Sequence, residues 1–115
     1  MAEVKICGLS EERHVAAAVD AGARFLGFVF FPKSPRAVTA TQAAALTAEV
    51  PVGVARVGLF VDPSDDLLRE VLDHAALDVI QLHGHESAGR VAEVKALTGL
   101  PVMKAEIGRA SCRER

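Results

Sequence analysis

The chain has 115 residues, of which half are hydrophobic and 24% are charged, with a formal net charge of −2. This balance excludes a disordered chain and a basic surface for nucleic acid, and no apolar run approaches the ~20 residues of a membrane span. Without a signal peptide pattern at its start, the chain is expected to be cytoplasmic, with no membrane partner. Cys7 and Cys112 show neither disulfide nor zinc-site spacing, so we expect reduced thiols and no metal.

Apolar runs typical of strands alternate with helical patterns along the whole chain. We expect strands at residues 4–6, 25–31, 55–61, 79–82 and 101–104. We expect helices at residues 11–21, 39–49 (or from 41), 64–75 and 86–97. Ser10 and Ser64 are candidate helix N-caps, and Gly22 is a candidate C-cap. The pattern predicts an α/β fold, a parallel sheet with helices outside.

Two architectures fit this order of elements. One is a doubly wound open sheet of five strands, complete at this length; the other is the first part of an eight-unit barrel, which typically needs ~250 residues. Periodicity does not choose between them.

The last ten residues differ from the rest of the chain. Residues 106–115 read Glu-Ile-Gly-Arg-Ala-Ser-Cys-Arg-Glu-Arg, abandon the preceding alternation and resemble a translated sequencing adapter. We therefore expect natural sequence over residues 1–105 and a non-native tail over 106–115. Arg109, Cys112 and Arg113 receive no functional role.

The stretch from Lys5 to Gly8 places a thiol where the first strand ends. Cys7 then lies at the carboxyl end of that strand, the edge at which parallel α/β folds bind ligands. The alternative is a small buried hydrophobic residue. Lys5 alternates with its neighbours and, inside a barrel, must pair with a carboxylate.

The loop that leaves the second strand holds two cations between prolines. Arg36 on such a stiffened loop can grip a carboxylate with two parallel hydrogen bonds, which a lysine cannot. The alternative is that Lys33 and Arg36 are solvated surface charges.

The end of the fourth strand carries two histidines, two positions apart. No third ligand is visible nearby, so we interpret Gln81 and His83 as polar lining of a cleft rather than as metal ligands. His85 and Glu86 are expected at the start of the next helix, where a carboxylate complements the helix dipole.

Four segments together resemble a known family. Residues 5–8 (KICG), 27–36 (GFVFFPKSPR), 57–61 (VGLFV) and 78–84 (DVIQLHG) are similar, in this order and spacing, to phosphoribosylanthranilate isomerases of tryptophan biosynthesis. The resemblance covers about residues 4–104. It implies the first four βα units and the fifth strand of a (βα)8 TIM barrel.

The resemblance also implies a reaction and its residues. Family members carry out an Amadori-type isomerisation of N-(5′-phosphoribosyl)anthranilate to 1-(2-carboxyphenylamino)-1-deoxyribulose 5-phosphate, without a cofactor. Cys7 matches the general base, which removes the proton from C2′ of the sugar, and Arg36 matches the residue that holds the anthranilate carboxylate. Lys5, Gln81 and His83 are expected to line the substrate site.

The resemblance implies two further parts of the active site that this chain does not encode. The general acid is an aspartate on a later strand, and the phosphate loops come from the last two units. The aspartates that fail to match this acid are Asp62, Asp65, Asp66 and Asp78. We expect the fragment alone to be inactive and to self-associate through exposed barrel edges. Two alternatives remain: a complete five-stranded α/β binding module without catalysis, and a different phosphosugar barrel enzyme.

Overall fold

A computed structural model describes residues 5–104 and 113–114 of the chain. The strands in this part are β1 (Lys5–Cys7), β2 (Phe25–Val29), β3 (Ala55–Phe60), β4 (Val79–Leu82), β5 (Val102–Lys104) and β6 (Arg113–Glu114). The helices are α1 (Glu12–Asp20), α2 (Ala40–Ala48), α3 (Asp65–His74) and α4 (Ala88–Thr98). The predicted strands and helices are present, with ends shifted by up to two residues, whereas β6 was not predicted.

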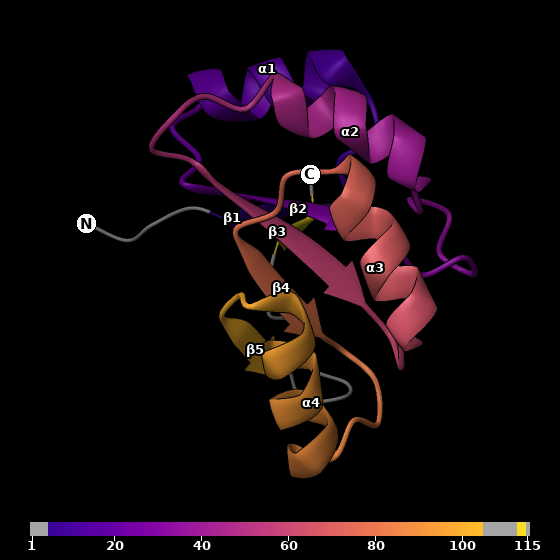
Figure 1. Cartoon of the computed structure of the whole chain (residues 1–115). Coiled ribbons are helices and arrows are strands. Elements are labelled where there is room, and N and C mark those ends of the chain that lie inside the picture. The colour runs from indigo at the N-terminus through magenta and orange to yellow at the C-terminus, as the bar shows by residue number, and fades with distance from the viewer. Residues whose placement is uncertain (1–4, 105–112, 115) are drawn as a thin grey trace.

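The order of the strands decides between the two architectures. The sheet is parallel and runs β5-β4-β3-β2-β1-β6. From β1 to β5 each strand lies beside its predecessor, and helices α2, α3 and α4 follow one another in the same order (Figure 1). A doubly wound sheet reverses its strand order at a switch point, and β1–β5 do not. The fold is therefore a run of consecutive barrel units.

The outer edge of β1 is covered by β6. Ile6 and Cys7 lie in register with Arg113 and Glu114, in parallel. The sequence predicts an unpaired edge here, because the first strand of a closed barrel pairs with the eighth, which this chain does not encode. Residues 105–112 and 115 lie outside the described part, so the non-native tail stays a prediction.

Hydroxyl side chains begin three of the helices. The N–H groups of Gln42, Leu67 and Arg90 each donate to a side-chain oxygen at 3.1 Å. The acceptors are Thr39, Ser64 and Ser87. Thr39, rather than Thr41, therefore starts α2, and such caps are each worth about 1 kcal/mol.

The expected cap of the first helix is wrong. Glu11, not Ser10, occupies the N-cap position of α1, and its side chain makes no capping hydrogen bond. The Glu11 carboxylate instead pairs with Arg13 at 3.3 Å and with His14 at 3.4 Å. The Glu11 side chain thus contacts a charged side chain instead of a backbone N–H of α1.

The sheet has two unlike faces, because side chains alternate along each strand. The helix-facing side holds the main core, whose largest fully buried side chains include Leu26, Phe28, Phe60, Leu68, Ile80 and Leu82. A smaller apolar cluster of Cys7, Val57 and Leu59 lies on the other face.

That second face is concave. The Lys5 ammonium on β1 donates a hydrogen bond to Oε1 of Gln81 on β4, although β2 and β3 lie between these strands. Neighbouring strands are about 4.8 Å apart, so β1 and β4 would be about 14 Å apart in a flat sheet. The sheet must curl for these side chains to meet, as the wall of a barrel does.

An ion pair ties β3 to β4 at their amino-terminal ends. Arg56 donates from Nε to Oδ2 of Asp78 at 3.0 Å and from its backbone N–H to the same oxygen at 2.8 Å. A second guanidinium nitrogen reaches Oδ1 at 3.1 Å, which makes the pair bidentate. The hydrogen bond from the Arg56 side chain lowers the pKa of Asp78.

We predict that Asp78→Asn destabilises the fold by about 1 kcal/mol, a modest value because solvent screens a half-exposed pair. The pKa of Asp78 is lower in the folded chain than in the unfolded chain. The contribution of its ion pair to the free energy of unfolding is therefore complete above the unfolded pKa of about 3.9, and it is lost as the pH falls through the folded pKa. Urea unfolding of parent and variant at one protein concentration, at pH 7 and near pH 2, measures this. An equal difference at both pH values would contradict the prediction.

Candidate active site

Cys7 lies at the carboxyl end of β1 on the concave face, with 4% of its surface exposed. Gly27 on the neighbouring strand makes room for it: a Cβ at Gly27 would lie 2.8 Å from Sγ of Cys7 and 3.2 Å from its Cα. Any larger residue at position 27 would displace the sulfur. The sequence therefore keeps a space beside Cys7 on this face.

The thiol state differs from the expectation. Cys7 is disulfide-bonded in this structure, and the other cysteine of the chain, Cys112, lies outside the described residues. The expectation of reduced thiols came from sequence spacing, which does not show that β6, near the end of the chain, lies beside β1. A disulfide sulfur cannot accept a proton, so any role of Cys7 as a base requires the reduced form.

Arg36 approaches the same end of β1. A Cβ added to Gly8, the residue after Cys7, would lie 2.4 Å from Cδ and 3.3 Å from Nε of Arg36. Gly8 has a φ of 79°, in the left-handed region that favours glycine, and its N–H donates to the carbonyl of Gly27 at 3.0 Å. The Arg36 side chain therefore lies directly against the turn that carries Cys7.

The loop that holds Arg36 folds back on itself. The N–H of Ser34 donates to the carbonyl of Phe31 at 2.9 Å, and the N–H of Ala37 donates to the carbonyl of Ser34 at 3.1 Å. The Arg36 N–H donates to Oγ of Ser34 at 3.2 Å. These bonds fix the backbone of Arg36, whereas Lys33 in the same loop is exposed.

Lys5, Gln81 and His83 form a polar row across the concave face. The Gln81 side chain, with 1% of the residue exposed, accepts a hydrogen bond from the Lys5 ammonium and lies 3.0 Å from Nε2 of His83. Lys5 thus donates to an amide oxygen, and the prediction that it pairs with a carboxylate is wrong. Burial lowers the pKa of Lys5.

His83 is held as a neutral ring at neutral pH. Burial lowers its pKa, and the ammonium groups of Lys5 and Lys104 lower it further. A neutral imidazole donates from one nitrogen and accepts at the other, so the row presents both kinds of hydrogen-bonding group to a ligand.

Sequence reasoning missed a buried carboxylate beside this row. Glu86 was predicted at the start of the fourth helix, but α4 begins after it, with Ser87 as its cap, and the Glu86 side chain is 1% exposed. Oε2 of Glu86 accepts from the N–H of Asp62 at 2.8 Å and of Gly84 at 3.2 Å. Only a contact between distant loops reveals this role, and no local pattern signals it.

Of the six aspartates in the described part, the four considered above as candidates for the general acid all have partners in the fold. Asp78 pairs with Arg56 at the opposite end of the sheet, and Asp65 pairs with Arg90 at 2.8 Å. Asp66 lies 3.7 Å from Arg69, and Asp62 accepts from the N–H of His85 at 2.9 Å. These contacts fit structural roles.

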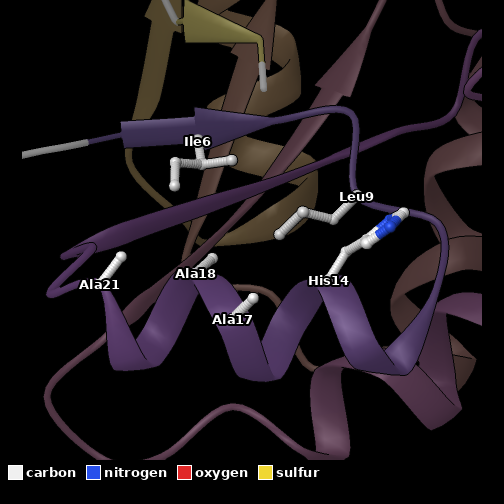
Figure 2. A pocket seen from close by; sticks show the side chains of 6 residues that line it. All are labelled: Ile6, Leu9, His14, Ala17, Ala18 and Ala21. Carbon is white, nitrogen blue, oxygen red and sulfur yellow. The ribbon is translucent and has the colours of Figure 1, made fainter.

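An apolar cavity of about 330 Å³ lies on the other side of β1. Figure 2 shows Ile6 and Leu9 pointing toward the side chains of α1, with His14 at one end. Ile6 faces this cavity and the adjacent Cys7 faces the concave side, so the cavity is separate from the polar row.

Within residues 5–104, no helix has the length and apolar character needed to cross a membrane. Across the same described stretch, no three acidic, histidine or cysteine side chains gather as metal ligands.

Comparison with known proteins identifies the family of this chain. Residues 4–114 match the profile of N-(5'phosphoribosyl)anthranilate (PRA) isomerase. The chain belongs to the phosphoribosylanthranilate isomerase family. The isomerase of Paracoccus denitrificans is 71% identical over 102 residues, which are 89% of this chain and 47% of that protein. The isomerase of Cereibacter sphaeroides (strain ATCC 17029) is 55% identical over 102 residues, 89% of this chain and 48% of its own length.

Solved isomerase structures have the same fold. A phosphoribosylanthranilate isomerase in complex with reduced 1-(o-carboxyphenylamino)-1-deoxyribulose 5-phosphate superposes with a TM-score of 0.84 at 34% identity, covering 90% of this chain and 53% of that one. The Thermotoga maritima isomerase gives a TM-score of 0.84 at 34% identity, covering 90% of this chain and 50% of that one. The chain thus spans about half the length of the isomerases that it matches.

Proposed function

We propose that this chain is the amino-terminal half of a phosphoribosylanthranilate isomerase, which converts N-(5′-phosphoribosyl)anthranilate to 1-(2-carboxyphenylamino)-1-deoxyribulose 5-phosphate in tryptophan biosynthesis. One observation carries the proposal: the Arg36 side chain lies against the turn that follows Cys7, at the carboxyl end of β1. The proposed base on β1 and the proposed carboxylate-binding group, on the loop that follows β2, thus lie at one rim.

The proposed reaction needs one acid and one base. After the acid has protonated the ring oxygen and the sugar has opened to an imine, the Cys7 thiolate takes the proton from C2′ and becomes a thiol. The electron pair of the C2′–H bond then forms the double bond of an enol-amine, which tautomerises to the ketone. A thiolate is favoured by nearby cations, and Lys5 lies two residues from Cys7 on the same strand face.

Positioning in the proposed site comes from Arg36 and the polar row. Arg36 would hold the anthranilate carboxylate through two parallel hydrogen bonds, with the ring beside the concave face. Gln81, His83 and Lys5 would bind the sugar hydroxyls, because buried polar groups in a cleft fix the orientation of a polar ligand.

The proposal is tested with a full-length chimera, in which residues 1–104 of this chain replace the corresponding half of the Paracoccus denitrificans isomerase. This relative is chosen because it is 71% identical over the replaced part. We expect the reduced chimera to isomerise phosphoribosylanthranilate. A chimera that folds and binds the reduced product analogue but shows no turnover would refute the proposal.

We predict that Arg36→Lys in the chimera raises KM about 10- to 100-fold, with a smaller change in kcat. The lysine keeps the charge but loses the second parallel hydrogen bond, and a hydrogen bond to a charged group is worth about 1.5–3 kcal/mol. Steady-state kinetics measure both constants. Lys33→Arg, an exposed position in the same loop, is the matched control. An unchanged KM in Arg36→Lys would remove Arg36 from the carboxylate site.

A further inference from the structure

Glu86 joins three segments at the carboxyl-end rim of the sheet. Its Oε2 accepts one backbone N–H from the β3–α3 loop, at Asp62, and one from the β4–α4 loop, at Gly84. Its Oε1 lies 3.0 Å from the ammonium of Lys104 on β5. The two groups form an ion pair, but their geometry is not that of a hydrogen bond. A single buried carboxylate thus contacts the ends of three consecutive units.

The contact between the two loops is reciprocal. The Asp62 carboxylate accepts from the N–H of His85, while the N–H of Asp62 donates to Glu86. Asp62 has a φ of 43°, a conformation that costs a non-glycine residue of order 1 kcal/mol. A Cβ at Gly84 would lie 2.6 Å from Oδ2 of Asp62 and 2.8 Å from its nitrogen. The two loops therefore pack closely against each other.

The joined loops include His83. Its N–H donates to the carbonyl of Phe60 at the end of β3 at 2.9 Å, and Gly84 follows it directly. The Lys104 ammonium also donates to the Gly84 carbonyl at 2.6 Å. The backbone around His83 is therefore fixed on both sides, by β3 and by the contacts of Gly84.

Charge links the same groups. Lys5 and Lys104 lower the pKa of His83, and the Glu86 carboxylate opposes them. Burial raises the pKa of Glu86, but the N–H bonds that it accepts, the largest from Asp62, and the Lys104 ammonium lower it by more. Glu86 is therefore a carboxylate at neutral pH and offsets part of the positive charge at this rim.

We propose that Glu86 is a positioning residue: its carboxylate locks the β3–α3 and β4–α4 loops together and so holds His83 over the concave face. The inference rests on the function proposed above, because the group that it positions belongs to the proposed substrate site. Glu86 itself acts through the loop backbone and Lys104.

Two substitutions in the chimera separate the roles of charge and of loop contact. Glu86→Gln removes the charge, yet its amide oxygen can still accept both N–H groups. Glu86→Ala removes both interactions. Glu93→Gln is the matched control, since Glu93 is an exposed carboxylate on α4 that lies near Arg90.

We expect Glu86→Ala to lower kcat about 10- to 100-fold, the size of effect that a misplaced active-site group produces, and Glu86→Gln to lower it less because the loop contacts remain. The titration of the His83 ring, followed by NMR, should move to lower pH, because the carboxylate that opposed the two ammonium groups is gone. In Glu86→Ala the amides of Asp62 and Gly84 should also exchange with solvent at least about 10-fold faster. Glu93→Gln should change none of these.

The readouts distinguish failure of this inference from failure of the proposed function. If the parent chimera shows no isomerase activity, the function is wrong, and the His83 titration with amide exchange still decides the role of Glu86. If Glu86→Ala does not fold, Glu86→Gln decides through the titration. A folded Glu86→Ala with parental kcat and parental amide exchange, or a folded Glu86→Gln with an unmoved His83 titration, would overturn the inference.

Discussion

Replacing Cys7 by serine in the chimera should lower kcat by about 10²–10⁴, the contribution of a positioned general base. A serine hydroxyl fills nearly the same space beside Gly27 but loses its proton far less readily than a thiol. KM should change little, because Arg36 and the polar row supply the proposed binding contacts. Steady-state kinetics under reducing conditions measure both constants.

The matched control for this substitution is Ser10→Ala. Ser10 is exposed, lies three residues from Cys7 and does not cap α1. Its replacement should leave kcat unchanged. If Cys7→Ser keeps the parental kcat while the chimera is active, another group removes the proton and Cys7 is not the base.

The 115-residue chain by itself should show isomerase activity at least about 100-fold below that of the chimera. It carries the proposed base, but Asp62, Asp65, Asp66 and Asp78 are engaged in other contacts, and loss of the general acid alone forfeits about 10²–10⁴ in rate. A turnover assay on both proteins, at equal concentration and under reducing conditions, measures the ratio. Equal rates would show that the chain carries its own acid.

Residues 1–105 expressed alone should self-associate. Within the described residues β5 pairs with β4 only, and its Met103 is 43% exposed, so its free edge and part of the concave face lack neighbours. Light scattering over a range of concentrations, together with amide exchange, tests this. A monomer with well-protected β1 and β5 amides would contradict the prediction.

Local signals predicted most of the fold. Thr39 and Ser64 cap α2 and α3 because the hydroxyl and the N–H it accepts are three residues apart, a relation visible in sequence. The apolar run at residues 25–31 predicted the second strand. The choice between open sheet and barrel required the strand order, which periodicity does not contain.

Contacts between distant residues account for what the sequence did not predict. Gln81 replaces the expected carboxylate beside Lys5 from 76 positions away, and Glu86 reaches Asp62 across 24 positions. The local context of Glu86 predicted a helix start, since nothing in the neighbouring residues shows that another loop supplies an N–H group. Likewise, spacing between cysteines did not reveal that the end of the chain pairs with β1.

The most direct test asks whether Cys7 and Arg36 face one ligand. In the reduced chimera, alkylation of Cys7 by iodoacetamide is followed by mass spectrometry of its peptide, with and without the reduced product analogue. We predict that saturating analogue slows alkylation of Cys7, and that Arg36→Met needs a higher analogue concentration for the same protection. Alkylation at one rate with and without bound analogue would show that Cys7 lies outside the substrate site.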